Sequence, residues 1–273
     1  MIYTLKQFPD KKFTDKMDLT RFIKKNLDEL RVKKMSEYKT DSEVFVRNEL
    51  VKEFVPEIET ITSDIIEVKS VINTTNIIDS HMDLHMPAIW NKTVKDNPFS
   101  YHLKQHEARF EGVISNKAKS FNEESNFNLL GLNIDFKTIA NINQFTLSKR
   151  KMPFMFDSYV NGDVKQHSIG MMYVNLDIAY YDEESQKQMD FFNESKAQAV
   201  NPDVADEYGY FWVVYEAKKR EGSAVVFGSN SVTPTLSVKN YEPEESTQQK
   251  IEPDNSTPKQ DKIDLLIKNI NER

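Results

Sequence analysis

Residues 166–181, QHSIGMMYVNLDIAYY, alternate with a period of two, which is the spacing of a β-strand and not of a helix. One side of this strand carries Ser168, Gly170, Met172, Val174, Leu176 and Ile178, and the other carries Ile169, Met171, Tyr173 and Asn175. From about residue 61, shorter β-branched and aromatic runs with turn residues between them surround it, as in TSDIIEVKSVINTT, FEGVISNKAKSF and FNLLGLNIDF. The chain is therefore predicted to be an α+β protein, a mostly antiparallel β-barrel or sandwich decorated by helices.

Composition divides the chain into three parts. From Asp18 to about Lys52 the sequence is charged and free of Gly and Pro, with apolar residues at helical spacing. This predicts a helical N-terminal extension over residues 1–60, either a surface helix packed on the main domain or an assembly element. Residues 61–236 form the predicted main domain. Residues 237–273 are predicted to be a disordered Pro/Glu/Ser-rich linker followed by a short amphipathic helix, DKIDLLIKNINER.

Two further helices are predicted inside the main domain. The segment IWNKTVKDNP is typical of a short helix that Pro98 ends. The segment DEESQKQMDFFNESKAQAV is charged and lies between two predicted strands. We expect it to be a helical or mobile insertion.

Composition also excludes several classes of function. A formal net charge of −7 argues against direct nucleic-acid binding, which needs clustered Lys and Arg. The absence of cysteine excludes disulfides, thiolate nucleophiles and thiolate zinc sites. The start, MIYTLKQFPDKKF, lacks the pattern of a signal peptide, and no apolar run approaches the roughly 18 residues that span a bilayer. The expected protein is soluble and intracellular, with no membrane partner.

A pair of histidines in HLKQHEARFEG offers a general base. His102 and His106 are four residues apart and share a face in either a strand or a helix. Imidazole suits this role because its ordinary pKa, about 6.5, lies close to neutral pH. Spacing alone does not choose between the two, and structural or surface histidines remain the alternative.

Ser168 is the candidate nucleophile. A hydroxyl on a largely apolar strand face is costly unless it has a partner. The neighbouring His167 points to the opposite face and so cannot act as its base within a regular strand. Gly170 leaves room on the face of Ser168 for a substrate backbone. The alternative is a buried serine bonded to a nearby carbonyl.

An acidic residue in REGSAVVF is a candidate for the third member of a catalytic triad, beside the histidine and the serine. Glu221 and Ser223 alternate with Gly222 and Ala224, which predicts an acid at the start of a buried strand. An inward carboxylate can orient a histidine and stabilise the imidazolium. Because KKRE is strongly charged, an exposed acid in a turn is the alternative.

The order of these segments resembles the prohead protease family of tailed phages, which is related to the herpesvirus assemblins. IIDSHMDLHMPAIWNKTVKDNP looks like the opening motif of that family, and LKQHEARFEGVIS looks like the strand with its histidine. QHSIGMMYV is similar to the nucleophile strand, and REGSAVVFGSNSVTPTL to the closing motif, an acid-small-Ser strand before a small-Asn turn. The resemblance covers about residues 61–236. It implies His106 as base, Ser168 as nucleophile and Glu221 as third member, although assemblins use a second histidine there.

The resemblance implies a serine endopeptidase of phage head maturation that needs no cofactor. It implies scaffold and major capsid proteins as partners and substrates, with cleavage of its own chain as well. The implied location is the host cytoplasm within the assembling procapsid, as a homodimer or higher assembly. Two alternatives stay open. One is an inactive assembly protein of the same fold, and the other is a metal-binding protein whose ligands come from His81, His85, His102, His106, Asp79 and Asp83.

Overall fold

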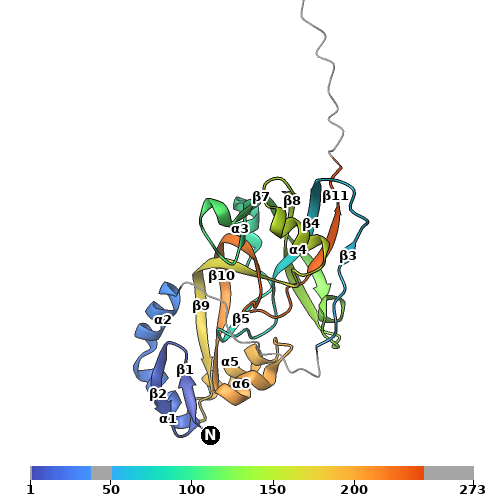
Figure 1. The fold of residues 1–273 in the computed structure, drawn as a ribbon. Coiled ribbons are helices and arrows are strands. Elements are labelled where there is room, and N and C mark those ends of the chain that lie inside the picture. Colours follow the sequence, from blue (N-terminus) through green and yellow to red (C-terminus); the bar gives the residue numbers. More distant parts are fainter. Residues whose placement is uncertain (1, 38–50, 243–273) are drawn as a thin grey trace, which may run out of the picture. The chain divides into compact units, whose positions relative to one another are not determined.

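The computed structural model describes residues 2–37 and 51–242 (Figure 1). Contacts group the described residues up to Tyr241 into one compact unit. The predicted linker was expected to begin at residue 237, but residues 237–240 belong to a strand of the sheet, Thr235–Asn240, which corrects this boundary. The rest of the predicted linker from residue 243 and the predicted C-terminal helix lie outside the described residues.

The described residues contain eleven strands and six α-helices. The strands are β1 (Tyr3–Leu5), β2 (Phe8–Phe13), β3 (Glu57–Ile58), β4 (Ile65–Thr74), β5 (Asp83–His85), β6 (Phe99–Lys104), β7 (Val113–Asn126), β8 (Lys137–Ser148), β9 (Gln166–Tyr180), β10 (Tyr210–Val225) and β11 (Thr235–Asn240). The helices are α1 (Lys16–Lys25), α2 (Leu27–Ser36), α3 (Asn91–Asp96), α4 (Pro153–Val160), α5 (Gln186–Lys196) and α6 (Pro202–Tyr208). Two short 3-10 helices cover Phe110–Gly112 and Phe127–Leu130.

Nine strands form one sheet in the order β3-β11-β4-β8-β7-β6-β10-β5, and β9 pairs with β10. Three pairings are parallel, namely β10 with β5, β10 with β6, and β11 with β3, and the others are antiparallel. The prediction of a mostly antiparallel, helix-decorated fold is confirmed. The predicted barrel is wrong, because no ladder among the described strands joins β3, at one edge of the sheet, to β9, at the other.

The ladder between β9 and β10 is the longest in the molecule, and the two strands run side by side in Figure 1. Ser168 lies opposite Ser223, and Gly170 lies opposite Glu221. Glu221 therefore sits near the end of β10 and not at the start of a strand, which corrects the sequence prediction. The basic residues before it belong to the same strand and do not form a turn.

A β-bulge separates Lys219 from Glu221. Lys219 pairs with Met171 and Glu221 with Gly170, so Arg220 is the extra residue on β10. Because Met171 and Gly170 point to opposite faces, the bulge also places Lys219 and Glu221 on opposite faces of the sheet.

The N-terminal segment packs into the main hydrophobic core. Leu19, Ile23 and Leu30 are fully buried or nearly so, in the same cluster as Trp212 of β10. Helices α1 and α2 agree with the helical prediction up to Ser36, whereas the hairpin of β1 and β2 was not predicted. Residues 38–50 of the predicted extension lie outside the described residues.

The other predicted helices are present. Helix α3 ends at Asp96, two residues before Pro98, and α5 and α6 occupy the insertion between β9 and β10 (Figure 1). Gly209 ends α6 with a φ of 74°, a left-handed conformation that glycine adopts without strain. Within residues 2–37 and 51–242, no helix is long and apolar enough to cross a membrane.

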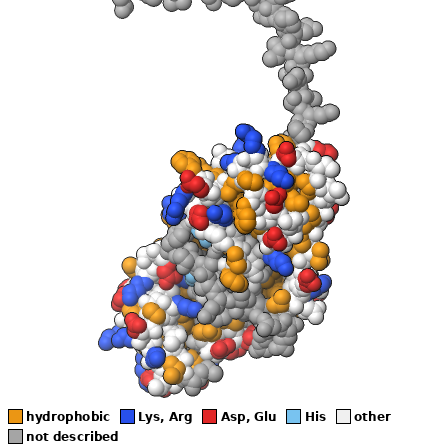
Figure 2. All heavy atoms as spheres, in the orientation of Figure 1, with side chains coloured by type: hydrophobic (Ala, Val, Ile, Leu, Met, Phe, Trp, Pro, Cys, Tyr) orange, Lys and Arg blue, Asp and Glu red, His pale blue; other side chains and the backbone are white. Residues whose placement is uncertain are grey.

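The surface drawn in Figure 2 mixes charges of both signs. Lys and Arg side chains are interspersed with Asp and Glu, and apolar side chains lie between them. Among the described residues drawn on this face, Lys and Arg side chains are scattered and do not gather into one broad patch.

Candidate active site

His106 lies in a strained turn that follows β6. Gln105 and His106 have φ angles of 51° and 57°, and a non-glycine residue in this region costs about 1–3 kcal/mol. Two backbone N–H groups of the turn bond to β10: Gln105 N–H donates to the carbonyl of Ala224 at 2.9 Å, and His106 N–H donates to Ser223 Oγ at 3.2 Å. Strain that neighbouring strands maintain is common at active sites.

The imidazole of His106 contacts Glu221. The distance from His106 Nδ1 to Glu221 Oε1 is 2.6 Å, and both side chains are 10% exposed or less. The second carboxylate oxygen, Oε2, accepts a hydrogen bond of 2.6 Å from Ser223 Oγ. A carboxylate on Nδ1 fixes the ring so that Nε2 is the nitrogen that exchanges protons, as in catalytic triads.

Ser168 shares the face of the His106–Glu221 pair. It lies directly opposite Ser223, and opposite residues on an antiparallel ladder have Cβ atoms about 4.5–5.5 Å apart. Ser168 is 6% exposed. Among the described residues no hydrogen bond joins its hydroxyl to His106, although catalytic hydrogen bonds are often long before a substrate binds. The three predicted residues are thus brought to one face, with a direct contact between two of them.

Gly170 makes room for the carboxylate of Glu221. A Cβ atom at this position would lie 2.0 Å from Glu221 Oε1, well inside van der Waals contact. The sequence analysis predicted that the space left by the missing side chain of Gly170 admits a substrate backbone. In the structure the carboxylate of Glu221 fills this space.

Gly170→Ala is expected to displace Glu221 from His106. We expect a loss of about 1–3 kcal/mol in the free energy of unfolding, the usual cost of overpacking, measured by chemical denaturation. The matched control is Val174→Ala on the same strand face, where the side chain is 37% exposed and the expected change is below about 1 kcal/mol. Equal stability of Gly170→Ala and the wild type would show that Glu221 moves at no cost.

A groove of about 550 Å³ borders Glu221. Its walls are mostly apolar, and Phe110 is 95% exposed beside it. The complete lining is Tyr101, Leu103, Ala108, Arg109, Phe110, Val113, Arg220 and Glu221. The groove is large enough for an amino-acid side chain and lies next to the candidate acid, features that sequence spacing did not indicate.

A chain of buried hydrogen bonds occupies the other face of the sheet. It accounts for His102 and His167, the two histidines close in sequence to the candidate site. Its contacts are Lys219 Nζ to Asn143 Oδ1 at 3.3 Å, Asn143 Nδ2 to His102 Nδ1 at 3.2 Å, His102 Nε2 to Tyr159 Oη at 3.3 Å, Tyr159 Oη to His167 Nε2 at 3.1 Å, and His167 Nδ1 to the Thr233 carbonyl at 3.0 Å. His102 is therefore a core residue, and His106 is the histidine that meets Glu221.

In this series of hydrogen bonds each group donates to the next, from Lys219 to the carbonyl of Thr233, and both imidazoles must be neutral. Because a carbonyl only accepts, His167 Nδ1 carries a proton and His167 Nε2 accepts from Tyr159. The same logic leaves His102 Nδ1 as an acceptor from Asn143. Burial lowers the pKa of His167 to about 4, against the opposing hydrogen bond to Thr233, and burial together with nearby positive charges lowers the pKa of His102 well below 6.5.

Lys219 begins this chain and was missed by the sequence prediction. Its side chain also donates to Ser120 Oγ. Burial lowers the pKa of Lys219 to about 7, with the charge of Glu221 acting in the opposite direction. The sequence analysis did not single out Lys219, because the run KKRE is strongly charged and such runs are typical of solvent-exposed turns.

The free energy of unfolding is expected to fall as the pH drops from 6.5 to 4. In this window unfolded His167 binds a proton at its ordinary pKa, whereas folded His167, with a pKa of about 4, does not. This residue alone removes about 3 kcal/mol across the window. Denaturant titrations at several pH values measure the slope, and His167→Gln should flatten it. An unchanged slope in that variant would contradict the assignment.

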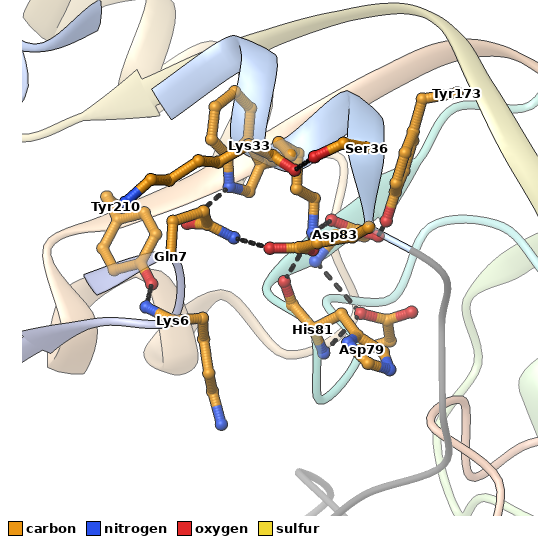
Figure 3. Close-up of polar contacts among 12 residues, drawn as sticks. Lys6, Gln7, Lys33, Ser36, Asp79, His81, Asp83, Tyr173 and Tyr210 are labelled. Carbon is orange, nitrogen blue, oxygen red and sulfur yellow. Dashed lines mark hydrogen bonds and ion pairs between the residues drawn. The ribbon is translucent and has the colours of Figure 1, made fainter. Parts of the chain in front are cut away.

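The alternative metal site, with ligands from four histidines together with Asp79 and Asp83, does not come together as one group in the part of the chain that the structure describes. Among the described residues, one group of three potential ligands comes together: Asp79, Asp83 and His85, whose ligand atoms lie within 4.8 Å of one another. Figure 3 shows the surroundings of Asp83, to which Tyr173 donates a hydrogen bond. The ammonium of Lys34 lies 2.6 Å from Asp83 Oδ1, and both side chains are fully buried. The lysine thus supplies the positive charge that a metal ion would bring.

Comparison with known proteins adds no further support. No protein-family model matches the chain, and no curated protein or solved structure is significantly similar to it.

Proposed function

We propose that this chain is a serine endopeptidase with Ser168 as nucleophile, His106 as general base and Glu221 as the acid that orients His106. The main support is the 2.6 Å contact between His106 Nδ1 and Glu221 Oε1, on the sheet face that carries Ser168. These residues come from three distant parts of the sequence. The groove beside Glu221 supports a substrate with a side chain to bury.

The proposed reaction is acyl transfer to serine. Ser168 Oγ attacks the scissile carbonyl carbon while its proton passes to His106 Nε2. Glu221 stabilises the resulting imidazolium. His106 then gives the proton to the leaving amine, the peptide C–N bond breaks, and a water molecule hydrolyses the acyl-enzyme in the same way.

Ser168 is a better nucleophile candidate than Ser223. The hydroxyl of Ser223 donates to Glu221 and accepts from the backbone of His106, and the residue is fully buried. A serine held in this way is an orienting group. Among the described residues Ser168 makes no hydrogen bond to Glu221, and it lies two positions along the ladder from that residue, on the same face of the sheet.

The proposed substrates are the scaffold and major capsid proteins of a tailed phage, together with the protease's own chain. The four motifs in family order support this proposal, as does an antiparallel sheet with the candidate serine and acid on adjacent strands. An assemblin-like fold and a site of action inside the assembling procapsid belong to the same proposal.

A fluorophosphonate probe tests the proposal without knowledge of the substrate. Such probes bind covalently to serines that a neighbouring base activates. We expect one labelled residue, Ser168, in a peptide identified by mass spectrometry, and no labelling in Ser168→Ala or His106→Ala. Labelling that is equal in wild type and His106→Ala would contradict the proposal, and a wild type that stays unlabelled would favour an inactive assembly protein.

A further inference from the structure

Ser223 connects the candidate acid, Glu221, to the turn that carries the candidate base, His106. Its hydroxyl donates to Glu221 Oε2 at 2.6 Å and accepts from the N–H of His106 at 3.2 Å. One oxygen atom therefore contacts both the acid and the turn that presents the base. Ser223 is fully buried, so water does not compete for these bonds.

The contact with His106 matters because the turn is strained. Two consecutive non-glycine residues, Gln105 and His106, have left-handed φ angles. Such a conformation persists only when surrounding bonds enforce it. The bond to Ser223 holds the turn to β10 together with the bond from Gln105 to Ala224 and the contact of the His106 ring with Glu221.

The contact with Glu221 matters because the carboxylate could otherwise rotate. Oε1 binds His106, and Oε2 binds Ser223, so the plane of the carboxylate is fixed at both ends. Gly170 leaves the space in which this orientation fits. Fixing an orienting group by a further hydrogen bond is a common way to hold an active site.

We propose that Ser223 is a positioning residue, whose hydroxyl locks the Glu221 carboxylate and the backbone of His106 into one arrangement. Its effect on activity rests on the proposed peptidase function. Its effect on the His106–Glu221 contact does not.

The test compares Ser223→Ala with Ser70→Ala. Ser70 is also a fully buried serine in a strand, and its hydroxyl makes no hydrogen bond among the described residues. The first measurement is the proton NMR signal of the His106 Nδ1–H, which a short hydrogen bond to a carboxylate moves far downfield, with assignment by its loss in His106→Gln. We expect Ser223→Ala to shift or broaden this signal and Ser70→Ala to leave it unchanged.

The second measurement separates kcat from KM in peptide cleavage. Loss of an orienting hydrogen bond is expected to lower kcat about 10–100-fold with little change in KM. If Ser223→Ala does not fold, Ser223→Cys replaces it, because a thiol of similar size is only a weak donor. An unchanged His106 signal in the folded variant would overturn the proposal. If the wild type cleaves no peptide, the peptidase function fails while the NMR comparison still decides the role of Ser223.

Discussion

For the peptidase proposed above, Ser168→Ala is expected to lower kcat/KM for cleavage of the proposed scaffold-protein substrate by about 10⁶, and His106→Ala by about the same factor. The double variant should be no worse than either single one, because a nucleophile and its base act as a unit. Glu221→Gln should cost less, about 10⁴, since it removes the orientation of the base and leaves the reacting atoms in place. Mass spectrometry of scaffold and capsid proteins co-expressed with each variant measures the loss.

Ser168→Ala removes one oxygen atom at a site that is 6% exposed, so the fold should survive. Thermal melting of each variant checks this point. Ser70→Ala again serves as the matched control and should retain full activity. Cleavage at wild-type rates by Ser168→Ala would end the assignment of the nucleophile, and additive losses in the double variant would show that His106 does not serve Ser168.

Lys34→Met is expected to reduce the free energy of unfolding by about 3–5 kcal/mol. The ammonium of Lys34 lies 2.6 Å from Asp83 Oδ1 and donates to the carbonyl of His81 at 3.0 Å. Burial, followed by the charges of Asp83 and Asp79, raises the pKa of Tyr173 well above 10, so this phenol stays protonated, donates a hydrogen bond to Asp83 and adds no second negative charge. Removing the lysine therefore leaves a carboxylate buried without its cation.

Chemical denaturation of three variants isolates this effect. Lys34→Met with Asp83→Asn should recover most of the loss, because the uncompensated charge is gone. Lys92→Met removes an ion pair with Glu216 in which the lysine is 64% exposed, and it should change stability by no more than about 1 kcal/mol. A Lys34→Met protein as stable as Lys92→Met would show that Asp83 takes up a proton at little cost.

Local patterns in the sequence predicted the parts of the site that depend on one segment. The alternation in β9 correctly separates Ser168 and Gly170 from His167, which is buried in the network on the other face. It did not predict that the face of Ser168 is partly open to solvent farther along the strand, where Met172 is 45% exposed. Burial depends on which other elements cover a strand, and a single segment does not carry that information.

The contacts that define the site are long-range, and no local pattern encodes them. The register that sets Ser168 opposite Ser223 joins strands far apart in the chain. The bulge at Arg220 turns Lys219 inward, whereas composition indicated a charged turn. The hairpin of β1 and β2 was missed for a related reason, because charged residues and Pro9 interrupt its alternation.

Strand β10 has two different neighbours along one edge, with β5 beside Trp212 and β6 beside Glu221. Asp83 of β5 lies opposite Trp212 and is held by the buried ion pair with Lys34. Glu221, the candidate acid, follows Trp212 by nine residues, about 30 Å along β10. A slip of β10 by one residue would turn Glu221 away from His106 altogether. Through Lys34, helix α2 therefore anchors the end of the β5–β10 ladder that lies farthest from Glu221, and so helps to keep β10 in the register that the site needs.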